Sequence, residues 1–249
     1  METGKYILVP MSGHSKWSTI KHQKGINDAR RGQLFSKLAR AITIAAKVGG
    51  GNPDSNLKLR LAMDKAREAN MPKENVERAV EKGKGAAGGT LQEVVYEGYG
   101  PGGVAILVEA ATDNRNRTTQ EIKSIFDKAE GSLGSPGSVS FQFEQKGLIL
   151  VDSVNDKDKE EKTLKIIDID GVDDVLEIKE GIEVYTSHSN LMKVKEEIEA
   201  LGISVKSAEL TFKPKTPLEV EEKKLDRIIK LINTLDEHDD TQKVYANLA

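Results

Sequence analysis

The spacing of apolar positions predicts that the first part of the chain is helical. Apolar side chains recur every three or four positions between Asp28 and Ala46, which is the period of an amphipathic helix. They are Leu34, Leu38, Ile42 and Ala45. A second helix is expected over Asn56 to Asn70, and a third over Lys73 to Glu81 that stops at Gly83. These three segments predict a three-helix domain over residues 11–84.

Glycine interrupts the helical pattern after the third helix. The stretch KGKGAAGGT has few side chains that could pack against a core, so we expect a flexible linker over residues 85–91. The helical domain would then be free to reorient relative to the rest of the chain.

Alternating and continuous apolar runs follow the linker and predict strands. EVVYEGY and VAILVEAAT are two expected strands joined by a tight turn at GPGG, and a helix is expected over Thr118 to Ala129. SVSFQFE and GLILV then predict two further strands joined at QKG. The whole segment reads as a β-β-α-β unit that lacks elements to cover its sheet.

Residues 152–213 predict a second unit of the same kind. The pattern indicates a helix at Lys159 to Ile167, a hairpin of VLEIKE and GIEVYTS, a helix at Asn190 to Leu201 and a strand at VKSAELTFK. The final helix, Leu218 to Leu235, and the last strand, VYANL, would complete the first unit. The predicted class is therefore α+β. Residues 92–151 and 214–249 form one domain, and residues 152–213 form a domain inserted into it.

The division of charge along the chain points to a polyanionic partner. The net charge is −3 overall, but Met11 to Lys84 carries 16 Lys and Arg against 7 Asp and Glu, whereas Asp152 to Ala249 carries 15 against 24. A basic block followed by an acidic one is typical of a protein that meets nucleic acid with one face. The alternative is two differently solvated surfaces.

The basic block contains the candidate nucleic-acid-binding residues. A cationic surface can neutralise phosphates while an aromatic ring stacks on an exposed base. The candidates are Lys16, Trp17, Lys21, His22, Lys24, Arg30, Arg31, Lys37 and Arg40. Trp17 could stack on a base, or it could instead anchor the N-terminal arm to the helical domain.

Two further arginines, Arg115 and Arg117, follow a strand and open a helix in TDNRNRTTQE. Anions are favoured at a helix N-terminus, so these residues are a candidate secondary anion contact. The alternative is that Asn114, Asn116 or Thr118 caps the helix while the arginines pair with nearby acids.

The remaining motifs do not predict a cofactor, a metal site or a catalytic centre. The chain has no cysteine, which favours a reducing cytoplasm, and the acidic cluster around His238 lacks the EF-hand pattern. No apolar run approaches the roughly 18 residues of a membrane span, and residues 1–10 read as an extension upstream of Met11. An anion-binding or hydrolytic enzyme that uses the arginine loop is the alternative from another class.

Several segments closely resemble those of the YebC family, which includes the mitochondrial translational activator of cytochrome oxidase. They are MSGHSKWSTIKHQKGINDARRGQLFSKLARAI, NMPKENVERAVEKG, VVYEGYGPGGVAILVEAATDNRNRT, GSLGSPGSVSFQFEQKG and HDDTQKVYANL. The resemblance implies three domains, two of them ferredoxin-like. It also implies one of two partners, promoter DNA for a transcriptional regulator, or ribosomal RNA for a ribosome-associated factor that aids translation through proline runs. The sequence does not indicate an oligomeric state.

Overall fold

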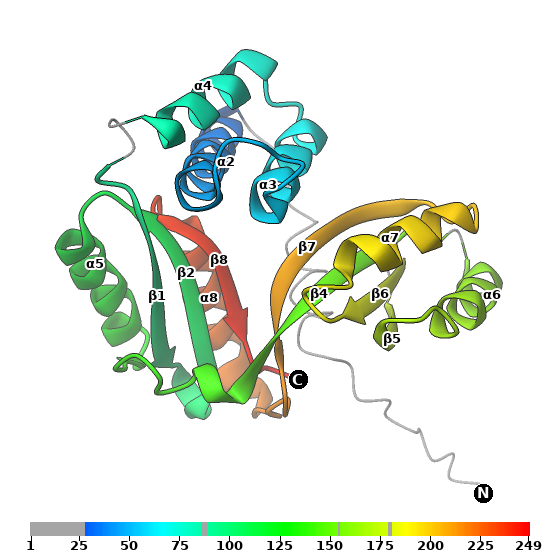
Figure 1. The fold of residues 1–249 in the computed structure, drawn as a ribbon. Helices are drawn as coiled ribbons and strands as arrows, with labels where there is room; N and C mark the ends of the chain where they lie inside the picture. The colour runs from blue at the N-terminus through cyan, green and yellow to red at the C-terminus, as the bar shows by residue number, and fades with distance from the viewer. Residues whose placement is uncertain (1–27, 86–88, 154, 179–180) are drawn as a thin grey trace, which may run out of the picture.

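The computed structural model describes residues 28–85, 89–153, 155–178 and 181–249. The first described part is helical (Figure 1), with α2 at Asp28–Gly49, α3 at Leu57–Glu68 and α4 at Lys73–Lys84. Asn56 caps α3, because its side-chain oxygen accepts a hydrogen bond from the Leu59 N–H at 3.1 Å. The predicted three helices are confirmed, although α4 continues through Gly83 to Lys84.

The predicted apolar stripe of α2 forms the core of the helical domain. Leu38, Ile42 and Ala45 are buried against Leu59 of α3 and Val80 of α4. Helices α2 and α4 also approach closely at Gly83, where an added Cβ would lie 2.5 Å from the Thr43 carbonyl oxygen. Gly83 therefore allows two helices to pack and does not end one.

The first sheet has the strand order β3-β1-β2-β8, and its pairs are antiparallel. Its strands are β1 (Gln92–Tyr99), β2 (Ala105–Thr112), β3 (Ser132–Leu133) and β8 (Thr241–Ala246). The short 3-10 helix η2, at Pro101–Gly103, joins β1 to β2, and Gly102 and Gly103 have positive φ. The tight turn predicted at GPGG is therefore confirmed.

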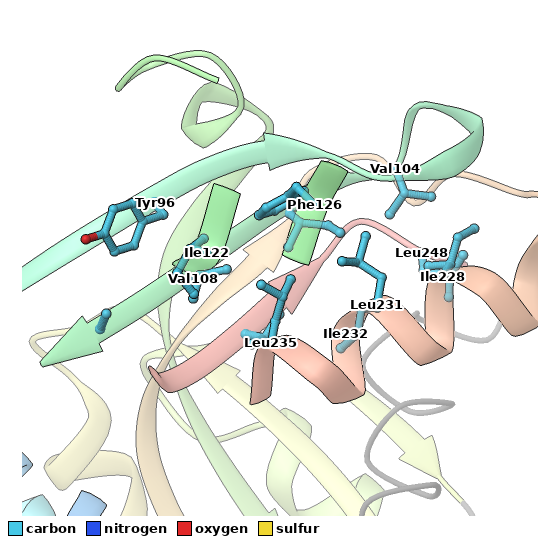
Figure 2. Packing of buried hydrophobic residues seen from close by; sticks show 13 residues of the cluster. Tyr96, Val104, Val108, Ile122, Phe126, Ile228, Leu231, Ile232, Leu235 and Leu248 are labelled. Carbon is cyan, nitrogen blue, oxygen red and sulfur yellow. The ribbon is translucent and has the colours of Figure 1, made fainter. Parts of the chain in front are cut away.

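Helices α5 (Arg115–Lys128) and α8 (Glu222–Glu237) cover one face of this sheet (Figure 1). Figure 2 shows Ile122 and Phe126 of α5 and Leu231 of α8 pointing toward the strands. The tail thus completes the first sheet, as predicted: α8 covers it and β8 extends it beside β2.

The second sheet has the strand order β5-β6-β4-β7 and is also antiparallel. Its strands are β4 (Phe143–Val151), β5 (Val172–Ile178), β6 (Gly181–Thr186) and β7 (Val205–Pro214). Helices α6 (Asp156–Ile167) and α7 (Leu191–Ala200) pack buried side chains against β4 and β6. The predicted hairpin and both predicted helices of this unit are confirmed.

The predicted strand pair SVSFQFE and GLILV is wrong. A loop and the 3-10 helix η3 (Ser140–Gln142) precede one continuous strand, β4, which belongs to the second sheet. Gly147 lies in mid-strand, where an added Cβ would meet Thr186 Oγ1 at 2.5 Å and Leu191 Cβ at 2.9 Å. This glycine allows close packing of α7 on the strand and does not form a turn. We propose domain limits near those predicted, with the second domain beginning at β4.

The other face of the first sheet packs against the helical domain and against the second sheet. Ile44 of α2 is buried with Leu91 and with Ala111 of β2. The Phe212 ring of β7 meets the Tyr245 ring of β8 edge-on, with centroids 5.2 Å apart. The helices α2–α4 therefore lie over the junction of the two sheets (Figure 1). Of the predicted linker, residues 86–88 lie outside the described residues.

Candidate nucleic-acid interface

The structure describes four of the nine residues predicted to bind nucleic acid. Lys16, Trp17, Lys21, His22 and Lys24 lie outside the described residues. Arg30 lies in α2, but the description does not extend to its side chain. Arg31, Lys37 and Arg40 remain, and all three project from α2.

Two of these cations contact residues 236–240, which are the end of α8 and the turn that joins it to β8. The Lys37 ammonium donates to the Asp236 carbonyl. The Arg40 guanidinium donates to the Asp239 carbonyl at 2.8 Å and to the Asp240 carboxylate at 2.6 Å. Two backbone carbonyls and the Asp240 carboxylate of residues 236–240 therefore hold α2 against the first sheet.

Asp240 is the centre of this contact, because its side chain is only 3% exposed and both its oxygens are engaged. Arg117 donates to it at 2.8 Å and the Thr118 hydroxyl at 2.6 Å. Burial alone would raise the pKa of this carboxyl. The hydrogen bonds from Thr118 and Arg117 and the charges of Arg40 and Arg117 outweigh burial and lower the pKa to about 2.

The two arginines at the start of α5 differ in their surroundings. Asn114 caps the helix by accepting from the Arg117 N–H at 3.1 Å, and the Arg117 guanidinium pairs with Asp113 as well as Asp240. Arg115 is exposed, and its side chain has no partner within the described part of the chain. At Arg117 the structure matches the alternative in which Asn114 caps the helix and the arginine pairs with nearby acids.

A groove of about 450 Å³ lies between α2 and α4, next to Thr90, Leu91 and Asp113. Phe35 of α2 lines it, and the Arg31 guanidinium lies 5.5 Å from the centre of the Phe35 ring. The guanidinium sits at cation–π distance from the ring. The groove is thus a concave surface with an aromatic side chain in its wall.

Two exposed cations of α4, Arg78 and Lys82, also line this groove. Neither has a hydrogen bond or ion pair among the residues that the structure describes. Sequence reasoning missed both, because Glu77 and Glu81 stand next to them and give α4 the look of a solvated helix. Their spacing of four residues, which places them on one helix face, was the available signal.

Most other cations of the helical domain are already paired. The ion pairs are Lys58–Glu93, Lys65–Glu209, Arg67–Asp64, Lys73–Glu77 and Lys84–Glu81. Lys47 donates to the carbonyls of Gly89 and Leu91. Among the described cations of α2, α3 and α4, Arg31, Arg78 and Lys82 therefore have no hydrogen bond or ion pair with another described residue, and two of them, Arg78 and Lys82, line the groove.

Among the described residues, Glu121, His238 and Asp240 bring possible metal-binding atoms within 4.8 Å of one another. Protein groups already occupy these atoms. His238 Nε2 lies 3.0 Å from Glu121 Oε2, and His238 Nδ1 accepts from the Asp240 N–H at 3.2 Å. Asp240 in turn binds two arginines. The geometry is that of a hydrogen-bonded turn.

No helix in the described ranges is long and apolar enough to cross a membrane.

Comparison with known proteins places the chain among close relatives. A probable transcriptional regulatory protein of Chloroflexus aurantiacus is 52% identical over 241 residues, covering 96% of this chain and 95% of the relative. A probable transcriptional regulatory protein of Trichlorobacter lovleyi is 49% identical over 239 residues, or 95% of each chain. The crystal structure of a conserved hypothetical protein from Aquifex aeolicus matches with a TM-score of 0.85 and 45% identity. It covers 94% of this chain and 97% of its own.

Two sequence models of protein families also match. The TACO1/YebC protein N-terminal domain matches residues 15–86, and the TACO1/YebC second and third domain matches residues 91–248. Because these matches and relatives span nearly the whole chain, the protein belongs to the TACO1/YebC family.

Proposed function

We propose that this protein is a non-enzymatic regulator of gene expression that binds nucleic acid through the groove between α2 and α4. The observation that carries the proposal is the position of Arg31, Arg78 and Lys82. They are the described cations of α2, α3 and α4 that have no hydrogen bond or ion pair with another described residue. Arg78 and Lys82 line the groove, and Arg31 lies against the Phe35 ring in its wall. Neutralising phosphates there would release counterions, which is the main source of affinity for nucleic acid.

DNA is the first target that we propose. The names of the two bacterial relatives describe probable transcriptional regulatory proteins, and such a role requires contact with DNA or with the proteins bound to it. Arg78 and Lys82 would contact the phosphate backbone, which fixes the position of a protein on DNA but does not read its sequence.

Ribosomal RNA is the second target, and the shape of the site favours it. The free cations surround a groove with an aromatic wall, whereas a duplex is bound by a convex element that enters its groove. Folded RNA offers unpaired bases and irregular phosphate arrangements that suit a concave surface. In this role the protein would associate with the ribosome and aid the synthesis of difficult, proline-rich sequences.

The test is the binding of the full-length protein to fluorescent duplex DNA and to a fluorescent RNA with internal loops. The double variant Arg78→Glu/Lys82→Glu should bind the preferred target at least tenfold more weakly than wild type, because two attractive phosphate contacts become repulsive. The double variant Lys206→Glu/Lys215→Glu changes the charge equally at two exposed positions, one in β7 and one just after it, and serves as the control. Equal affinity of the α4 variant and wild type would place the binding surface elsewhere.

A further inference from the structure

The groove between α2 and α4 has an apolar floor. Ala39 and Ala79, from facing helices, lie in it beside Met71 and Leu91. The two alanines leave open the space that larger side chains would fill. The volume of about 450 Å³ lies within the range of roughly 300–1,000 Å³ that is typical of pockets for small ligands.

Polar groups line the same groove above the floor. They come from Ser36 of α2, Asn75 of α4 and Thr90. The Asn75 amide and the Thr90 hydroxyl have no side-chain partner within the described residues, whereas the Ser36 hydroxyl donates to the Gly32 carbonyl at 3.0 Å. A free amide offers both donors and an acceptor, so it can pair with the polar edge of a flat heterocycle.

Charge and aromaticity complete the lining. Phe35 supplies a ring on which a planar group can stack, and Arg78 and Lys82 supply charge for an adjacent phosphate. Asp113, the acid in the lining, is paired with Arg117 at 3.1 Å, and Arg40 is paired with Asp240. The charge that remains for a ligand is therefore positive.

An apolar floor, a polar edge, an aromatic wall and two cations match the parts of a nucleotide. A base within a duplex cannot enter such a groove, because its faces are stacked and its edge is paired. We propose that the groove is a binding site for one unpaired nucleotide of a single strand, an inference that rests on the nucleic-acid-binding function proposed above. The base lies on the alanine floor beside Phe35, and a phosphate lies at Arg78 and Lys82.

Single-stranded DNA and RNA share this chemistry, so the experiment includes both. Fluorescence anisotropy would measure the binding of the full-length protein to labelled single-stranded RNA, single-stranded DNA and duplex DNA of one sequence. We expect at least one single strand to bind about tenfold or more tightly than the duplex, as expected for the gain of a stacked base. Preference for RNA over single-stranded DNA would identify RNA as the source of the nucleotide, through its 2′-hydroxyl.

Two variants test whether the groove makes this difference. Ala39→Met fills the floor and Phe35→Leu removes the ring, and each should lower single-strand affinity about tenfold with little change for the duplex. Ala200→Met, at an exposed position at the end of α7, is the matched control for the first. If Ala39→Met fails to fold, Phe35→Leu carries the test alone.

The outcomes separate this inference from the proposed function. Equal binding of single strands and duplex by wild type, or an unchanged preference in the folded variants, would overturn the nucleotide site and leave nucleic-acid binding intact. No binding to any of the three probes would overturn the proposed function itself.

Discussion

At the scale of single residues, two side chains that the sequence predicted to bind nucleic acid instead make contacts within the protein. Lys37 and Arg40 were predicted to meet phosphates, yet they contact residues about 200 positions later in the chain. No local pattern reveals a partner at that separation. Arg78 and Lys82 were not predicted, because each stands next to a glutamate in the sequence, yet neither has a partner among the residues that the structure describes. The prediction that this domain binds nucleic acid stays a prediction, and the structure changes which of its described cations are available for a partner.

Replacement of Asp240 by asparagine should destabilise the protein by about 2 kcal/mol at neutral pH. The pKa of Asp240 falls from its ordinary value of 3.8 to about 2 on folding, and a shift of one unit corresponds to about 1.4 kcal/mol. Urea unfolding of wild type and Asp240→Asn would measure the difference. Asp239→Asn is the control, because Asp239 is exposed and accepts a single side-chain bond, from Gln33 at 3.2 Å.

The lowered pKa of Asp240 also determines how the stability difference between wild type and Asp240→Asn depends on pH. A carboxyl with a lowered pKa stabilises the folded state above its unfolded pKa, and this stabilisation disappears as the pH falls through the folded value. The difference between wild type and Asp240→Asn should therefore be full above about pH 5 and shrink between about pH 4 and about pH 2. A difference that stays constant over that interval would mean that the charge of Asp240 contributes nothing.

At the scale of elements, the periodicity of apolar residues located the helices well and the strands less well. Buried side chains fall on the predicted apolar face of α2, and α5 and α7 lie where helices were predicted. The error came at Gly147, where a glycine between two apolar runs looks the same in a turn as in a strand that a helix approaches closely. A strand pattern also carries no information on its partner, so β4 could not be assigned to the second sheet from sequence.

Gly83→Ala should destabilise the helical domain, although alanine usually favours a helix by about 1 kcal/mol over glycine. The added Cβ would lie 2.5 Å from the Thr43 carbonyl oxygen and 2.7 Å from the Ala46 Cβ, so α2 and α4 would have to separate. Gly32→Ala is the matched control, because its Cβ would meet no atom within 4 Å and should stabilise α2. Thermal unfolding followed by circular dichroism should show a lower Tm for Gly83→Ala and a higher Tm for Gly32→Ala than for wild type. A change of Tm in the same direction for both variants would contradict the close packing of α2 and α4 at Gly83.

At the scale of the whole molecule, the basic and acidic parts of the chain bind each other as well as solvent. Lys65 of α3 and Lys243 of β8 lie 2.9 and 3.0 Å from the same carboxylate oxygen of Glu209 in β7. Burial would raise the pKa of Glu209, but the charges of the two lysines hold it well below its usual range. Some of the charges that suggested a polyanionic partner therefore form ion pairs between the three parts of the molecule, whereas Arg78 and Lys82 at the groove have no such pair within the described residues.

Deletion of residues 218–249 should unfold the first sheet selectively. It removes β8 from the edge of β2 and strips the α8 side chains from the core in Figure 2. Hydrogen exchange should show loss of protection at Ile106–Ala110 of β2, while amides of β4 and β6 stay protected. Unchanged protection of β2 would mean that the tail does not complete this sheet, and the account of the inserted second domain would then fail.

The salt dependence of binding tests most directly the claim that the groove neutralises phosphates. For wild type, the logarithm of the binding constant should fall with the logarithm of salt concentration with a slope of about 2 or more, because each phosphate neutralised by Arg31, Arg78 or Lys82 contributes about 0.7 to 0.9. In Arg78→Gln/Lys82→Gln, the slope should decrease by about 1.5, the contribution of two phosphate contacts. An unchanged slope in this variant, or a flat response of the wild type, would contradict the account.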